Sequence, residues 1–272
     1  MSALPLPFFE HGQERLEALA GTRLLCAFDF DGTLAPIVTQ PEHARTPLPV
    51  LQRLIELQSH VPIAVITGRS IADIRDKLGF EPDYLVGNHG QEGVPGMTAH
   101  AVRHAGQCAQ WKSALQRMLA EPAFDPNIWI EDKTYSLSLH YRLARDQQSA
   151  EAALREALAR LTPVPRIVGG KCVFNVLPED AFDKGRALVA LMQVCDAPHA
   201  LYVGDDVTDE DVFRLARPDI LSLRIGRSGE SAARFYLNHR LDLLQVLDRL
   251  VRRLRETGAM NWLPRGTVQT GT

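Results

Sequence analysis

The feature that most constrains this chain is a short apolar run that stops at acidic residues, within RLLCAFDFDGTL at residues 23–34. Residues 24–28 have the length of a strand buried on both faces, and Asp29, Asp31 and Gly32 end it. In an open α/β sheet, ligands bind at the carboxyl ends of the strands. Two carboxylates one residue apart repel each other, so they need a cation, a shared proton or, in an ordinary exposed turn, full solvation. A bound Mg²⁺ would satisfy these oxygens and leave one carboxylate free to attack a phosphorus atom.

Composition limits the classes of protein that fit. The 272 residues suffice for one large domain or two small ones, and a net charge of −3 gives no reason to expect a nucleic-acid or membrane partner. No apolar run approaches the roughly 20 residues that span a bilayer, and the start does not resemble a signal peptide. The cysteines lack metal-site spacing, which favours free thiols in a reducing compartment. We therefore expect a cytoplasmic protein that is a monomer or weak oligomer and has a small-molecule partner.

A second apolar strand, at residues 62–66, ends in Thr67, Gly68 and Arg69. A hydroxyl and free backbone amides at a strand-to-helix turn form a natural cradle for phosphate. The alternative is an ordinary turn with a helix cap, which Ser70 or its neighbour would provide.

A third strand, at residues 84–86, is followed by GNHG at residues 87–90. Glycines on either side indicate a tight turn that presents Asn88 and His89. Such turns are also common in loops without a binding role, so the pattern alone leaves both interpretations open.

Lys184 lies in the first turn of an expected helix that begins near Asp183. The helix dipole disfavours a cation at this end. A residue that breaks a local rule in this way is more often functional than decorative.

The strand expected at residues 199–203 continues into GDDVTDED at residues 204–211. Thr208 and Asp211 fit a capping box for the next helix. Asp205 and Asp206 precede that helix at a strand end, where uncompensated charge is costly, so helix capping does not explain them.

The middle of the chain, from about residue 100 to 178, predicts a separate α/β unit with a small antiparallel sheet and helices on one face. We expect a short strand near Ala101, helices over 107–120 and 146–161, and strands over 128–132, 135–141, 165–168 and 172–177. Strict alternation places side chains on the polar faces of these strands: Ser136, Ser138, His140 and Arg142; Trp129, Glu131 and Lys133; Lys171, Val173 and Asn175. This face is either solvated or a recognition surface for a polar anionic ligand.

Read together, DFDGTLAPI, TGRS, VGNHG, LSLHYR, GKCV, DKG and GDDVTDED resemble, in this order, the motifs of trehalose-6-phosphate phosphatases of the haloacid dehalogenase (HAD) superfamily. The resemblance covers roughly residues 24–215. It implies an α/β fold with a Rossmann-like HAD core and a parallel sheet over residues 1–100 and 179–272. Residues 101–178 would form an inserted α/β cap domain with an antiparallel sheet, which recognises the substrate.

The resemblance also implies roles for single residues. Asp29 would be the nucleophile that forms an aspartyl-phosphate, Asp31 the general acid and base, and Thr67 and Lys184 the groups that hold the phosphoryl oxygens. Mg²⁺ would bind to Asp29, the Asp31 backbone carbonyl and Asp205, with Asp206 and Asp209 in support. Further substrate contacts are expected from the turns and the cap: Gly68, Arg69, Asn88, His89, Lys133, His140, Arg142, Lys171 and Asn175.

One departure affects the substrate. The family usually carries a Glu after G-K-x-V, and this chain has Asn175 there. A phosphatase for another sugar phosphate, such as sucrose phosphate, a glycosylglycerol phosphate or mannosyl phosphoglycerate, therefore stays open. A signalling receiver domain shares the phosphorylated Asp, but it is shorter and lacks the insertion. A catalytically silent sugar-binding relative would not need the complete set of core residues.

Overall fold

The computed structural model describes residues 4–170 and 172–258 and divides into two compact units. We call Met1–Pro95 with Phe182–Thr272 the core unit, and Gly96–Ala181 the insert unit. Among the described residues, we find no helix whose length and apolar character would let it cross a membrane.

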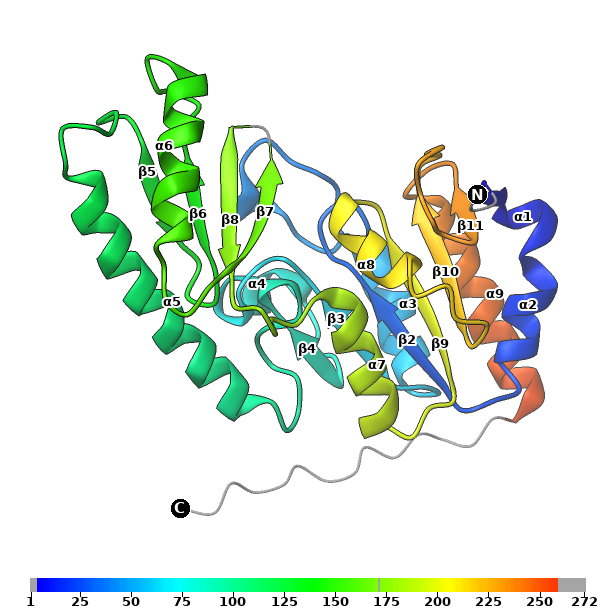
Figure 1. Ribbon diagram of the computed structural model, residues 1–272. Coiled ribbons are helices and arrows are strands. Elements are labelled where there is room, and N and C mark those ends of the chain that lie inside the picture. The colour runs from blue at the N-terminus through cyan, green and yellow to red at the C-terminus, as the bar shows by residue number, and fades with distance from the viewer. Residues whose placement is uncertain (1–3, 171, 259–272) are drawn as a thin grey trace. The chain divides into compact units, whose positions relative to one another are not determined.

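A seven-stranded parallel sheet in the order β1-β11-β10-β9-β2-β3-β4 forms the centre of the core unit (Figure 1). The strands are β1 (Leu6–Pro7), β2 (Leu24–Phe28), β3 (Ile63–Ile66), β4 (Tyr84–Val86), β9 (His199–Gly204), β10 (Ile220–Ile225) and β11 (Phe235–Leu237). All five residues of β2 are buried, as expected for a strand with a neighbour on each side and helices on both faces. The predicted parallel sheet is confirmed.

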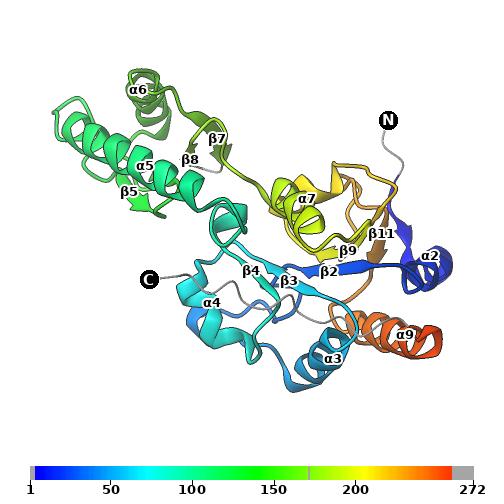
Figure 2. The same cartoon turned by 90° about the horizontal axis from the view of Figure 1, so that it is seen from below.

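Helices cover both faces of this sheet. They are α1 (Phe8–His11), α2 (Gln13–Leu19), α3 (Leu48–Gln58), α4 (Ile71–Leu78), α7 (Lys184–Val194), α8 (Glu210–Phe213) and α9 (Asp242–Thr257), with short 3-10 turns η1 (Pro41–His43), η2 (Asn88–Gly90) and η3 (Val207–Asp209). Figure 2 shows α7 on one side of β2 and β3, and α3 and α9 on the other. As expected, Ser70 caps α4, because its side chain accepts a hydrogen bond from Asp73 N.

The insert unit contains a four-stranded antiparallel sheet in the order β5-β6-β8-β7. The elements are α5 (Thr98–Leu119), β5 (Trp129–Asp132), β6 (Leu137–His140), α6 (Gln147–Ala159), β7 (Arg166–Gly170) and β8 (Val173–Leu177). Apolar residues of α5 and α6 pack with Leu139 and Phe174 of the sheet in one buried cluster. The predicted antiparallel sheet with helices on one face is confirmed.

The short strand expected near Ala101 is wrong, because α5 already begins at Thr98. His104, Cys108, Trp111 and Leu115 are the buried residues of this helix. Their spacing of three or four residues places them on one helical face, and the helix also includes the residues from Thr98 to Arg103, none of which is buried.

Candidate active site

Residues from separate strand ends meet at one edge of the core sheet. β2 pairs with β3 and β9 so that Phe28 lies beside Val65 and Val203. The chain therefore leaves these three parallel strands at nearly the same level. This register brings Asp29 close to the residues that follow β3 and β9, although they are far apart in the sequence.

Lys184 lies at the centre of the site. Its Nζ is 2.7 Å from Asp29 Oδ1 and 2.8 Å from Asp209 Oδ1, and all three side chains are buried. Two buried carboxylates would be costly without a cation beside them. The side chain of Asp183 caps the helix by accepting from Arg186 N, and the two carboxylates offset the unfavourable position of Lys184 in the helix dipole.

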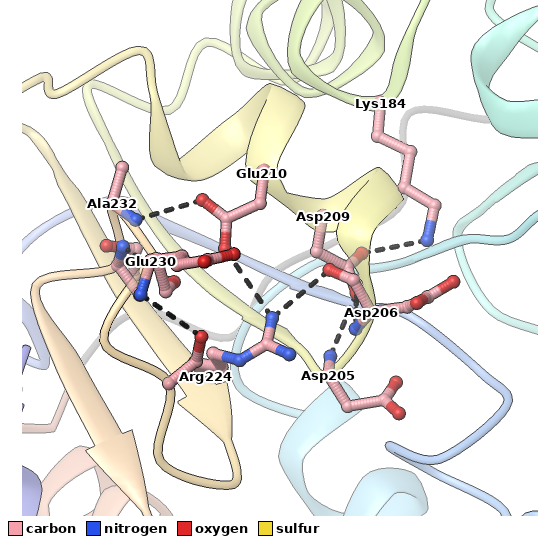
Figure 3. A network of polar contacts seen from close by, with 12 residues as sticks. Lys184, Asp205, Asp206, Asp209, Glu210, Arg224, Glu230 and Ala232 are labelled. Atoms are coloured by element: carbon pink, nitrogen blue, oxygen red, sulfur yellow. Dashed lines mark hydrogen bonds and ion pairs between the residues drawn. The ribbon is translucent and has the colours of Figure 1, made fainter. Parts of the chain in front are cut away.

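The Asp209 carboxylate accepts four hydrogen bonds, of which Figure 3 shows those from Lys184, Asp205 and Asp206. Lys184 and the Tyr202 hydroxyl, at 2.7 Å, donate to Oδ1; the backbone amides of Asp205 and Asp206, at 2.8 and 2.9 Å, donate to Oδ2. Tyr202 is absent from the predicted site because it reads as one more apolar residue of a buried strand. The available signal was its hydroxyl, which needs a partner when the ring is buried.

The prediction named the wrong residues for the capping box. Asp206 and Asp209, rather than Thr208 and Asp211, make the reciprocal side-chain and backbone contacts. The cause is that the 3-10 turn η3 begins before α8, so the first free amides lie closer to β9. Asp206 therefore shapes the loop that carries Asp205.

Asp205 lies against the turn that follows β2. Its Oδ1 accepts a hydrogen bond from Thr33 Oγ1 at 3.3 Å. Gly32 has φ of 79°, and a Cβ at this position would come within 2.0 Å of Asp205 Oδ2. Only glycine combines this backbone conformation with such a close approach, which explains the glycine in D-x-D-G-T.

Carboxylate oxygens of Asp29, Asp205 and Asp209 lie within 4.8 Å of one another. Burial raises the pKa of Asp29 to about 7; Lys184 opposes this increase, whereas Asp209 and Asp205 add to it. Burial, together with the charges of Asp209 and Asp206, raises the pKa of Asp205 to about 6. Oxygen donors whose negative charges repel each other are suited to a hard divalent cation, so this donor set fits Mg²⁺.

The carboxylate of Asp31 is bound by Arg69. Arg69 Nε and Nη2 donate to its two oxygens, both at 2.7 Å, while Nη1 donates to Asp73 Oδ2 at 2.7 Å. The guanidinium also lies 5.6 Å from the centre of the Phe30 ring. The structure thus places Arg69, a predicted substrate contact, on the predicted general acid in a bidentate ion pair.

The turn after β4 supports the turn after β3. Thr67 is fully buried, and its Oγ1 accepts from Arg69 N at 3.2 Å. His89 N donates to Thr67 O at 2.9 Å, and Asn88 N donates to Arg69 O at 2.8 Å. Asn88 and His89 have φ of 49° and 57°, a strained region for residues with a side chain. The His89 ring also contacts Gly68, where a Cβ would lie 2.4 Å from it.

On the helix-free face of the insert sheet, two predicted sugar contacts share one partner. Glu131 Oε2 lies 2.9 Å from His140 Nε2 and 3.5 Å from Lys133 Nζ. The His140 ring stacks on Trp129, with centroids 4.1 Å apart and planes inclined by 11°. Trp129 is 49% exposed and is a polar-face residue that the predicted site omits.

The other predicted substrate contacts of the insert unit do not share a partner with one another. Asn175 Oδ1 accepts from Ser138 Oγ at 2.7 Å, and its Nδ2 donates to Val168 O at 3.4 Å. Arg142 is exposed beyond the end of β6, so the predicted strand alternation does not extend to it. Lys171 lies outside the described residues.

Comparison with known proteins identifies the family. The profile of the family described as Trehalose-phosphatase matches residues 27–233. The chain belongs to the trehalose-phosphatase family. Its relatives include the trehalose-phosphate phosphatase of Mycobacterium tuberculosis strain H37Rv, which is 30% identical over 242 residues, covering 84% of this chain and 61% of that protein. The Mycobacterium marinum protein of the same name is 27% identical over 256 residues, covering 90% and 65%. This trehalose-phosphatase family member thus spans less than two thirds of the length of these relatives.

Solved structures resemble the family member across its length. A trehalose-6-phosphate phosphatase from Aspergillus fumigatus superposes with a TM-score of 0.70 at 23% identity, covering 92% of this chain and 99% of that one. The sucrose-phosphatase of Synechocystis superposes with a TM-score of 0.54 at 18% identity, covering 84% and 98%. The likeness confirms the predicted α/β fold, a parallel-sheet core with an inserted α/β unit.

Proposed function

We propose that this protein hydrolyses trehalose 6-phosphate to trehalose and inorganic phosphate, with Mg²⁺ and through an aspartyl-phosphate. The observation that carries the proposal is the buried Lys184 between Asp29 and Asp209 at the carboxyl edge of the sheet. Phosphoryl transfer needs a nucleophile, neutralisation of the phosphoryl oxygens and a proton for the leaving group, and this edge offers all three. The family match and the names of the mycobacterial relatives support the substrate.

In the first step, an Asp29 oxygen attacks phosphorus, and the bond between phosphorus and the sugar oxygen breaks. Asp31 gives its proton to that oxygen, so trehalose leaves as the alcohol. Thr67 and Lys184 hold the phosphoryl oxygens. Because Asp31 is paired with Arg69, this role requires Asp31 to exchange at least one Arg69 contact for the substrate.

In the second step, the Asp31 carboxylate takes a proton from water, and the water oxygen attacks phosphorus. The bond to Asp29 breaks, which releases inorganic phosphate and restores the Asp29 carboxylate. Mg²⁺, bound by the Asp29 and Asp205 carboxylates and the Asp31 carbonyl with Asp206 and Asp209 in support, would neutralise charge on the phosphoryl oxygens.

The insert unit is part of the proposal as the domain that recognises the sugar. Its helix-free sheet face carries Glu131 with Lys133 and His140, and these polar groups can bind sugar hydroxyls. Asn175, where the family usually has Glu, is oriented by Ser138 and is neutral. This difference favours testing sucrose 6-phosphate as a second candidate substrate.

The proposed location of the protein is the cytoplasm. Free thiols at all four cysteines support a cytoplasmic location, because disulfides are rare in reducing compartments. The expected state is a monomer or weak oligomer that acts on a phosphorylated disaccharide, and size-exclusion chromatography with light scattering tests it.

The deciding experiment is release of inorganic phosphate from trehalose 6-phosphate, glucose 6-phosphate and sucrose 6-phosphate, with Mg²⁺ and with EDTA. We expect Mg²⁺-dependent turnover of the trehalose ester alone. Asp29→Asn should lower kcat by about a thousandfold or more, with an unchanged circular dichroism spectrum. Activity that survives in Asp29→Asn would refute the mechanism, whereas turnover of another ester would refute only the substrate.

A further inference from the structure

Three potential metal ligands converge in the insert unit, and none belongs to the candidate active site. His100 and His104 lie one turn apart on α5, and Asp180 follows β8, one residue before the unit ends. Donor atoms of the three side chains lie within 4.8 Å of one another. His104 Nε2 is 3.0 Å from Asp180 Oδ1, and His100 Nδ1 is 3.8 Å from Asp180 Oδ2.

A cationic side chain already lies among these donors. Arg103 Nη2 donates to Asp180 Oδ2 and is 3.1 Å from His100 Nδ1. Because a guanidinium offers only N–H donors, His100 Nδ1 must be the acceptor, with its lone pair directed toward the cation. The cluster therefore already presents an imidazole lone pair and a carboxylate to a positive charge, and these are the donor types of zinc sites.

The side chains differ in their freedom to move. His104 is 2% exposed, so packing fixes the position of its ring, whereas the Arg103 side chain is 56% exposed. Arg103 can turn toward solvent while the two histidines and the carboxylate keep their backbone positions. A metal ion can thus replace the guanidinium without repacking α5.

We propose that His100, His104 and Asp180 bind a divalent transition metal of the Zn²⁺ class in exchange for the Arg103 guanidinium. Imidazole nitrogens select such ions over Mg²⁺, which prefers oxygen ligands. His104 binds through Nε2, so the proton that now faces Asp180 moves to Nδ1 of the same ring. The bound ion ties the start of α5 to the end of the insert unit, and protonation of the histidines at low pH releases it.

The test is isothermal titration of the full chain with Zn²⁺ in saturating Mg²⁺, which keeps oxygen-donor sites occupied. We expect one equivalent to bind. His100→Ala should weaken this binding roughly tenfold or more, and Arg103→Ala should strengthen it because a competing cation is removed. His43→Ala, an exposed histidine of the core unit, is the matched control and should change nothing.

His100 and Arg103 are both exposed enough to be replaced without loss of folding. Absence of saturable Zn²⁺ binding in both the wild type and Arg103→Ala would overturn the proposal. Equal affinities of His100→Ala and His43→Ala would overturn it as well. As a second measurement, saturating Zn²⁺ should raise the Tm of the wild type more than that of His100→Ala, and equal increases would also contradict the site.

Discussion

Replacing Tyr202 by phenylalanine removes one hydrogen bond from a fully buried carboxylate and keeps the ring. The Tyr202 hydroxyl donates to Asp209 Oδ1 at 2.7 Å, and both residues are 0% exposed. Burial and the neighbouring Asp209 charge raise the pKa of Tyr202 well above its usual value, so the hydroxyl stays protonated and remains a donor. The substitution therefore tests how much Asp209 depends on a residue that sequence patterns did not reveal.

The magnitude follows from the remaining partners. Asp209 keeps Lys184 at 2.8 Å and two backbone amides, so three of its four hydrogen bonds stay. A hydrogen bond to a charged group contributes about 1.5–3 kcal/mol. Because Lys184 still neutralises the same oxygen, we expect the free energy of unfolding to fall by about 2 kcal/mol.

Tyr141→Phe in the insert unit is the matched control. Its hydroxyl donates to Glu151 Oε2 at 3.3 Å, and the Glu151 side chain is 39% exposed, so the same change should cost less than about 0.5 kcal/mol. Urea unfolding should be followed by circular dichroism, which reports on both units, whereas Trp111 and Trp129, the tryptophans among the described residues, both lie in the insert unit. Equal losses in the two variants, or a neutral Tyr202→Phe, would refute the reasoning.

Two further predictions concern the acidic edge. Gly32→Ala should lower the free energy of unfolding by about 1–3 kcal/mol more than Gly226→Ala. Both glycines have φ near 80°, but only at Gly32 would a Cβ lie close to Asp205. Equal losses in urea unfolding would contradict this, because backbone strain alone would then explain both. The pKa of Asp205, raised to about 6, means that its stabilising contribution to the metal-free fold is present at low pH and is lost as the pH rises through that value. Mg²⁺ needs the carboxylate, so the increase in Tm on adding Mg²⁺ should grow from about pH 5 to about pH 8, and an increase independent of pH would contradict this.

The strands and their polar ends could be predicted from the sequence because the signals are local. Apolar runs of strand length stop at Asp29, Thr67 and Asp205, and parallel strands share their carboxyl edge. The partners of these residues could not be predicted in the same way. Arg69 lies two residues from Thr67 in the sequence, but its guanidinium contacts Asp31 because the chain turns back after β3.

Pairing across space also explains the other differences. A tyrosine in a buried strand looks like core, and only the folding of η3 beneath β9 brings Asp209 to the Tyr202 hydroxyl. No residue of α5 before His104 is buried, so the periodic spacing of its buried residues begins only at His104. In each case the missing information is a tertiary contact rather than a local preference.

The count of charges at the edge explains why Lys184 is shared between two aspartates. Asp29, Asp205 and Asp209 carry three negative charges when ionised, and one ammonium reduces the sum to −2. A divalent cation balances that sum, whereas protons balance it only by occupying the oxygens that, in the proposed mechanism, bind Mg²⁺ or attack phosphorus. Asp209 and Asp29 share the Lys184 ammonium. The ammonium therefore lowers the cost of burying Asp29 but does not neutralise its charge completely. Asp29, the proposed nucleophile, thus stays ionisable although it is buried, as the proposed phosphoryl transfer requires.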